Sequence, residues 1–188
     1  MEMKEKILTC AQRLVQQRGF NGFSYADIAH EVGIRKASLH HHFPTKVDLG
    51  LTLINVYSEQ LNNALINISS SSLPANDKLL EYIALYRASL DAERMCLGGM
   101  LATEVQTLDP VMLPSLKQFF TRNTKWLTEI LIEGQAQQLF FLGEPAANYA
   151  RMLLSTLQGA LLISRATGNA ETFEQTVSSL MTSLMRKG

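Results

Sequence analysis

The sequence has few of the features that mark secreted, membrane-bound or disulfide-stabilised proteins. It has only two cysteines, Cys10 and Cys96, so a disulfide framework is not expected. No apolar run reaches the length of a membrane span, and the first residues, MEMKEKIL, lack the apolar core of a secretory leader. We therefore expect a reduced, cytoplasmic protein that is not inserted into a membrane.

Motifs of the common enzyme classes are also missing. The sequence has no glycine-rich phosphate loop, no nucleophile elbow and no paired carboxylates at an obvious cleft. Three consecutive histidines, His40, His41 and His42, suggest a metal site. Neighbouring residues on a helix point in different directions, however, so the three cannot converge on one ion. We expect no enzyme activity, no metal and no cofactor.

Charge of either sign is scarce and balanced, with 17 Lys and Arg against 17 Asp and Glu. A net charge of zero argues against a protein that coats nucleic acid along its whole surface. The distribution is uneven, because residues 1–50 carry seven basic and five acidic side chains and all four histidines. This asymmetry favours a small basic DNA-binding head on a neutral to acidic body.

Helical periodicity runs through the whole sequence, and no segment has the alternation of a convincing strand. We expect an all-α fold of about nine helices. The first spans about 3–18, the second and third lie within 24–43, and the fourth ends near Ile68. The fifth helix spans about 77–92. After a break at 97–99, the sixth runs to about 107. The seventh, eighth and ninth span about 110–138, 145–168 and 170–186. The apolar segment 139–142 is interpreted as a buried helix end or loop.

The stretch 24–43, SYADIAHEVGIRKASLHHHF, has the pattern of two short helices joined by a tight turn. Ser24 and Asp27 form a capping pair at the start of the first helix. Gly33 suits the left-handed backbone of the turn, and Leu39 is the inward residue of the second helix. This pattern predicts a helix-turn-helix, although an ordinary helical hairpin in a bundle would share it.

The motifs around this stretch favour the first interpretation. A first helix ending in "RGF" is followed by "IAHEVGI" and then by "HHFPTKVDL". With these motifs, segment 4–53 resembles the DNA-binding domain of the TetR family of transcriptional repressors. The sequence departs from the family pattern at three positions. The family usually has a small hydroxyl residue at Arg35, a glycine at Ala37 and a tyrosine at His40.

The resemblance implies a set of DNA contacts. Arg35 and Lys36 lie at the start of the recognition helix, where side chains can donate to guanine edges or to phosphates. Lys46, at the start of the fourth helix, is expected to clamp a phosphate, although an ordinary solvated lysine would look the same. The predicted DNA contacts are Ser24, Tyr25, Arg35, Lys36, Ala37, Ser38, His40, His41 and Lys46.

The resemblance also implies a small-molecule pocket in the fifth to seventh helices. Aromatic and methionine side chains with a few polar groups suit such a pocket, and they equally suit core packing. The expected ligand-binding residues are Tyr82, Tyr86, Cys96, Met100, Glu104, Phe119, Asn123 and Trp126. Cys96 is either a sensor of electrophiles and oxidants or inert packing.

Apolar residues on more than one face of the eighth helix indicate burial on more than one side. A thick monomer core would explain this pattern. The resemblance to TetR-like proteins implies a different explanation, in which the last two helices of one chain pair with those of a second chain. The expected dimer contacts are Leu157, Ala160, Leu161, Ser179, Leu180 and Ser183.

Together these patterns predict a helix-turn-helix DNA-binding domain over 1–50 and a ligand-binding and dimerisation domain over 51–188. The expected function is ligand-responsive regulation of transcription, most simply a repressor that leaves its operator when it binds a small molecule. The expected partners are a palindromic double-stranded DNA operator, an effector and a second copy of the chain. The alternative is a TetR-like protein-binding adaptor or coactivator without specific DNA binding.

Overall fold

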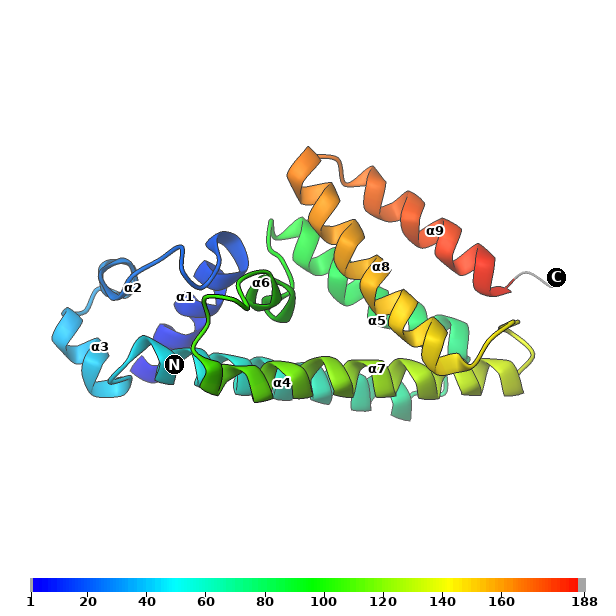
Figure 1. The fold of residues 1–188 in the computed structure, drawn as a ribbon, viewed down its shortest axis with the longest axis horizontal. Coiled ribbons are helices and arrows are strands. Elements are labelled where there is room, and N and C mark those ends of the chain that lie inside the picture. Colours follow the sequence, from blue (N-terminus) through cyan, green and yellow to red (C-terminus); the bar gives the residue numbers. More distant parts are fainter. Residues whose placement is uncertain (1, 186–188) are drawn as a thin grey trace. The chain divides into compact units, whose positions relative to one another are not determined.

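A computed structural model describes residues 2–185 of the chain, and in these residues the fold is all-α (Figure 1). The helices are α1 (Met3–Arg18), α2 (Tyr25–Val32), α3 (Lys36–His42), α4 (Lys46–Ser70), α5 (Ala75–Asp91), α6 (Leu97–Thr103), the short 3-10 helix η1 (Pro110–Met112), α7 (Leu113–Ala136), α8 (Ala146–Thr167) and α9 (Glu171–Met185). The predicted fold class is confirmed.

The chain divides into two compact units. The first holds the described residues up to Gln60 together with Arg94–Phe119, and the second holds Leu61–Glu93 and the described residues from Phe120 onward. Helix α6 therefore belongs to the same unit as α1, α2 and α3. The expected functional division at residue 50 stays a prediction.

The core of the first unit is built on α1. Its predicted inward residues, Ile7, Cys10, Ala11, Leu14 and Val15, are all buried. A reciprocal pair of hydrogen bonds fixes the segment before α6 to this helix. Met95 N–H donates to the Gln16 carbonyl at 3.0 Å, and Gln16 Nε2 donates to the Met95 carbonyl at 3.0 Å.

In the second unit, α8 and α9 pack side by side as an antiparallel pair (Figure 1). The turn between them contains Gly168, whose φ of 67° is in the left-handed region that glycine tolerates. The segment 139–142 is not helical and connects α7 to α8. Phe140 is buried, whereas residues 139, 141 and 142 are partly exposed, and Phe141 N–H donates to the Leu184 carbonyl at 2.8 Å. The segment is therefore a loop, as one of the two interpretations had it, but only Phe140 of it is buried.

One predicted boundary is wrong. The glycines at 98 and 99 do not interrupt a helix but lie inside α6, which ends at Thr103 rather than near 107. A Cβ atom on Gly98 would lie 2.4 Å from the Phe119 ring, so this glycine permits close packing instead of a turn. The chain turns before α6, where Glu93 has a φ of 54°. The predicted end of α9 at Arg186 lies outside the described residues.

Candidate functional site

The geometry of α2 and α3 is set by local hydrogen bonds at their ends. The Ser24 backbone N–H and hydroxyl both donate to Asp27 Oδ2 at 2.7 Å. These bonds lower the pKa of Asp27, with the Ser24 side chain as the main cause. Gly33 ends α2 in the left-handed region at φ 76°. Leu39 and Phe43 are buried, and the other side of α3 is left exposed.

Tyr25 was expected to contact DNA, but the structure places it inside the unit. It is 6% exposed, and its hydroxyl donates to the Phe43 and Thr45 carbonyls at 2.9 and 2.6 Å. The His40 ring lies 4.8 Å from the Tyr25 ring. Tyr25 therefore joins α2 to the junction between α3 and α4. We assign it a role in positioning the recognition helix.

Lys46 is also occupied within the unit. Its ammonium donates to the Phe23 carbonyl and lies over the Phe23 and Phe20 rings, at 4.3 and 5.0 Å from their centroids. Burial is the main cause that lowers the pKa of Lys46. An ammonium group has three donors, so a phosphate contact stays a prediction.

A capping box occupies two of the backbone amides at the start of α4, those of Thr45 and Asp48. Thr45 and Asp48 form a complete capping box, in which Asp48 N–H donates to Thr45 Oγ1 at 3.1 Å and the Thr45 N–H and hydroxyl donate to Asp48 Oδ2. The carboxylate also places negative charge at this helix end, where it opposes a phosphate.

Positive charge without an ion-pair partner lies on the exposed side of α3 and at its start. Arg35, Lys36, Ala37, Ser38, His40 and His41 are exposed. Neither Arg35 nor Lys36 has an ion-pair partner among residues 2–185, and α3 itself carries no carboxylate. His40 Nδ1 donates to the Pro44 carbonyl at 3.1 Å, so the other ring nitrogen, Nε2, is not used in this bond. A short helix with this surface suits contact with the phosphates and base edges of a DNA groove.

The second unit contains a buried cluster of neutral polar groups. Tyr82 hydroxyl donates to Asn123 Oδ1 at 3.1 Å and lies 3.3 Å from Tyr86 hydroxyl. Gln158 Nε2 donates to Tyr86 hydroxyl at 3.2 Å. The Trp126 ring stacks on Tyr82 at 5.2 Å between centroids. The structure thus brings together four of the predicted ligand-binding residues, and it adds Gln158, which the sequence analysis missed.

Comparisons with known proteins agree with this geometry. Residues 7–51 match the family model described as bacterial regulatory proteins, tetR family. A TetR-family transcriptional regulator from Agrobacterium tumefaciens is 32% identical, the alignment covers 98% of each chain, and the TM-score is 0.94. The chain belongs to the TetR family.

Two curated relatives align with most of this TetR-family chain. One is an uncharacterised HTH-type transcriptional regulator of Lactococcus lactis, 27% identical over 98% of this chain and 94% of the relative. The other is the HTH-type transcriptional repressor DhaR of a Mycobacterium species, 24% identical over 92% of this chain and 87% of the relative. The protein is therefore a DNA-binding transcriptional regulator and not an enzyme.

The remaining predicted ligand-binding residues of this regulator belong to the first unit. Tyr57 hydroxyl donates to Cys96 Sγ at 3.8 Å, and the Tyr57 and Phe119 rings lie 5.7 Å apart. Cys96 is 7% exposed, and burial with a hydrogen bond favours packing over sensing. Met100 is partly exposed and has no polar partner that the structure describes.

Glu104 was expected to bind the ligand, but its carboxylate holds the turn between α1 and α2. It accepts from Phe20 N–H at 2.5 Å and from Asn21 N–H at 3.0 Å. Asn21 Nδ2 also donates to Thr107 Oγ1 at 2.8 Å. The carboxylate lies 3.0 Å from the position of a Cβ atom on Gly19. We therefore remove Glu104 from the ligand set.

The predicted dimer contacts fall into two groups. Leu157, Ala160, Leu161 and Leu180 are buried within the single chain, whereas Ser179 and Ser183 are exposed. The three buried α8 positions pack in the chain's own core, so their contribution to a dimer contact stays a prediction. The exposed apolar residues of α8 are Met152, Leu162 and Ile163. Gly159 lies between them, with open space beside its Cα.

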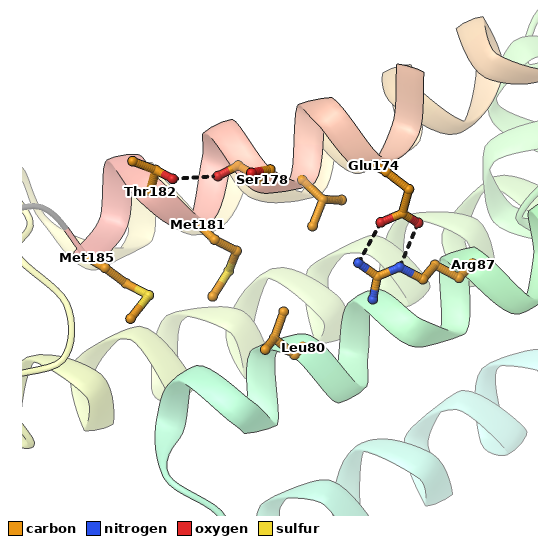
Figure 2. Close-up of a pocket in the computed structure, with 8 residues that line it drawn as sticks. Leu80, Arg87, Glu174, Ser178, Met181, Thr182 and Met185 are labelled. Atoms are coloured by element: carbon orange, nitrogen blue, oxygen red, sulfur yellow. Dashed lines mark hydrogen bonds and ion pairs between the residues drawn. The ribbon is translucent and has the colours of Figure 1, made fainter. Parts of the chain in front are cut away.

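A groove runs between α5 and α9 (Figure 2). Its volume is about 520 Å³, and it is lined by Leu80, Arg87, Glu174, Val177, Ser178, Met181, Thr182 and Met185. The bidentate ion pair between Arg87 and Glu174 lies at one end, with N–O distances of 2.7 and 2.8 Å. The groove is open to solvent, so it encloses a ligand only in part.

Two features are absent from residues 2–185. No group of three or more His, Cys, Asp or Glu side chains is placed to hold a metal ion. No helix in the described part is both long enough and apolar enough to cross a bilayer.

Proposed function

We propose that this regulator is a repressor and that a small neutral molecule, bound at the Tyr82 cluster, lowers its affinity for DNA. The observation that carries the proposal is Gln158 Oε1, which is buried and accepts no hydrogen bond within the described residues. An unsatisfied buried acceptor costs about 1–3 kcal/mol. A ligand that donates to this oxygen would recover that free energy.

The chemistry of the cluster limits the effector. Its polar groups are the neutral hydroxyls of Tyr82 and Tyr86 and the amides of Asn123 and Gln158. None of these four side chains is a counter-ion for a charged ligand, which would therefore lose the favourable hydration of its charge without compensation from them. The Trp126 and Tyr82 rings offer flat apolar surfaces. The proposed effector is therefore an uncharged, partly aromatic molecule with a hydroxyl or amide N–H donor.

Repression and symmetry are proposed from the relatives and from the surface of α8. DhaR is named a repressor, and two DNA-binding heads related by a two-fold axis require a palindromic operator. We place the dimer seam on the exposed face of α8 around Gly159 and Ile163, with Ser179 and Ser183 of α9 beside it. A small residue among apolar ones allows two helices to approach closely.

Glu104 is the proposed route by which the effector acts on the DNA-binding helices. Helix α5 carries Tyr82 and Tyr86 and continues through residues 92–96 directly into α6. The carboxylate after α6 holds the Phe20 and Asn21 amides at the start of the helix-turn-helix. A shift of α6 would therefore move this turn. The effector shifts the population towards a state in which the two heads no longer match their operator.

The test uses an operator selected from random duplex DNA and a library of neutral aromatic compounds. A compound that releases the operator should bind Gln158→Leu at least tenfold more weakly, because the variant removes the acceptor. Ser178→Ala, in the α5–α9 groove, is the control and should bind as the wild type does. If Ser178→Ala loses the response and Gln158→Leu retains it, the effector binds in the groove and the Tyr82 cluster is only core.

A further inference from the structure

Polar side chains from α1, α2 and the segment before α6 surround a small cavity in the first unit. Its volume is about 280 Å³, and its lining residues are Lys6, Thr9, Cys10, Arg13, Glu31, Val32 and Arg94. None of these residues belongs to the predicted DNA contacts or to the Tyr82 cluster. The cavity is smaller than typical sites for drug-sized ligands, which begin at about 300 Å³.

The lining has an excess of positive charge. Arg13, Lys6 and Arg94 are cationic, and Glu31 is the one carboxylate among the lining residues. Glu31 is already engaged, because Arg13 Nη2 donates to it, and this bond is the main cause that lowers its pKa. Burial raises the pKa of Cys10 to about 11, so the thiol at the cavity stays neutral.

Two of the cations have no partner of their own. Neither Lys6 nor Arg94 forms an ion pair within the described residues. Arg94 Nε is buried and donates no hydrogen bond, although buried donors in folded proteins nearly always have an acceptor. The exposed Thr9 hydroxyl also lines the cavity. Lys6 and Arg94 therefore lack a negatively charged acceptor, since Glu31 is engaged by Arg13.

The position of Arg94 is fixed by the backbone on both sides. Glu93, before it, adopts a φ of 54°, which is uncommon for a residue with a side chain. Met95, after it, is tied to Gln16 by the two reciprocal hydrogen bonds. These contacts hold the backbone of Arg94 beside α1 before any ligand arrives, and such preorganisation lowers the cost of binding.

We propose that this cavity binds a small oxyanion, and that its occupant is a phosphate group held by Arg94 and Lys6 with a hydrogen bond from Thr9. A guanidinium matches phosphate oxygens with paired N–H donors, and such charge-assisted bonds are stronger than neutral ones. The bound group would join the segment before α6 to α1. This site is separate from the proposed effector site and does not depend on it.

The test is titration calorimetry of the full chain with inorganic phosphate, pyrophosphate and succinate, in chloride buffers of equal ionic strength. We expect one saturable phosphate site per chain, weakened about tenfold or more in Arg94→Gln. Lys4→Gln is the control, because it removes one positive charge from α1 at a residue that does not line the cavity and lies over the Phe43 ring. It should bind as the wild type does. Succinate is also an oxyanion but carries carboxylates, so its affinity relative to that of phosphate decides whether the site prefers phosphate or carboxylate.

Two further variants separate a binding role from a structural one. Glu31→Gln removes the competing carboxylate and should bind phosphate more tightly, whereas a merely structural change would not improve binding. Arg94→Lys keeps the charge and should retain part of the affinity. The proposal is overturned if binding does not saturate, or if Arg94→Gln melts normally in chloride and binds phosphate as the wild type does. It is also overturned if Arg94→Gln weakens DNA binding in phosphate-free buffer and flattens its salt dependence, since Arg94 would then contact DNA.

Discussion

At the scale of single residues, the Tyr25 hydroxyl holds α2 to the junction between α3 and α4 through the Phe43 and Thr45 carbonyls. The sequence places this tyrosine one residue after the cap of a DNA-binding helix, which is why it was expected to contact DNA. Its burial depends on where Phe43 and Thr45 lie in three dimensions. No local pattern in the sequence reports that position.

Tyr25→Phe is expected to destabilise the fold by about 1–3 kcal/mol, because it removes the hydroxyl that donates to the buried Phe43 carbonyl. DNA affinity should fall for all sequences, but the slope of its salt dependence should stay the same, since the variant neutralises as many phosphates as the wild type. Lys36→Ala is the comparison, and it should lower the slope with little loss of stability. Equal changes of slope in the two variants would contradict the positioning role.

The buried hydroxyl of Tyr25 should also make the free energy of unfolding depend on pH in the alkaline range. Burial is the main cause that raises the pKa of Tyr25 to about 12, above the value of about 10 for an exposed tyrosine. Folding therefore favours the protonated hydroxyl. Its contribution to the free energy of unfolding is fully present below about pH 10 and is lost as the pH rises through about 12. Tyr25→Phe should lose less stability over this interval than the wild type, as measured by denaturation at each pH.

At the scale of elements, helix pattern and capping residues predicted most of the fold. The cap at Ser24, the left-handed Gly33 and the inward face of α1 depend only on neighbouring residues. The predicted helix break at 97–99 was wrong because a glycine can either permit a turn or allow close packing. Gly98 allows close packing against Phe119. The carboxylate of Glu104 and the amide of Gln158 act through partners 50 or more residues away, which periodicity cannot identify.

The exposed face of α8 makes a prediction about assembly. Ile163→Glu should convert the proposed dimer to a monomer that stays folded, because Ile163 is 53% exposed in the single chain and a charge in the proposed seam would be desolvated. Ile66→Glu, at a residue that is 54% exposed on α4, is the control and should stay dimeric. Analytical ultracentrifugation measures both. Leu161→Glu cannot make this distinction, because Leu161 is fully buried and the variant would unfold the chain.

The bonds of Glu104 make a second prediction at this scale. Glu104→Gln keeps the shape but replaces a carboxylate with an amide, and it should lower the free energy of unfolding by about 1–2 kcal/mol. It should also weaken the effector's influence on DNA binding more than it weakens effector binding itself. Glu129→Gln, on the surface of α7, is the control for loss of one charge. An effector response in Glu104→Gln that equals the wild type would remove Glu104 from the route.

At the scale of the whole molecule, the regulator has an exposed basic surface on α3, a proposed site for a neutral effector in the second unit and a proposed dimer seam on α8. The family, the fold and the class of function followed from the motifs between residues 4 and 53. The effector and operator did not, because they depend on side chains that a helical pattern does not constrain.

Specific binding to a symmetric operator is the central claim, and selection of bound duplexes from a random pool at low salt tests it most directly. The account predicts enrichment of a sequence with two inverted half-sites, bound by one dimer. Its affinity should fall linearly with the logarithm of salt, and Lys36→Ala should flatten the slope by about 0.9 for each phosphate that the variant no longer neutralises. Recovery of no preferred sequence, or of an asymmetric site bound by a single chain, would contradict it.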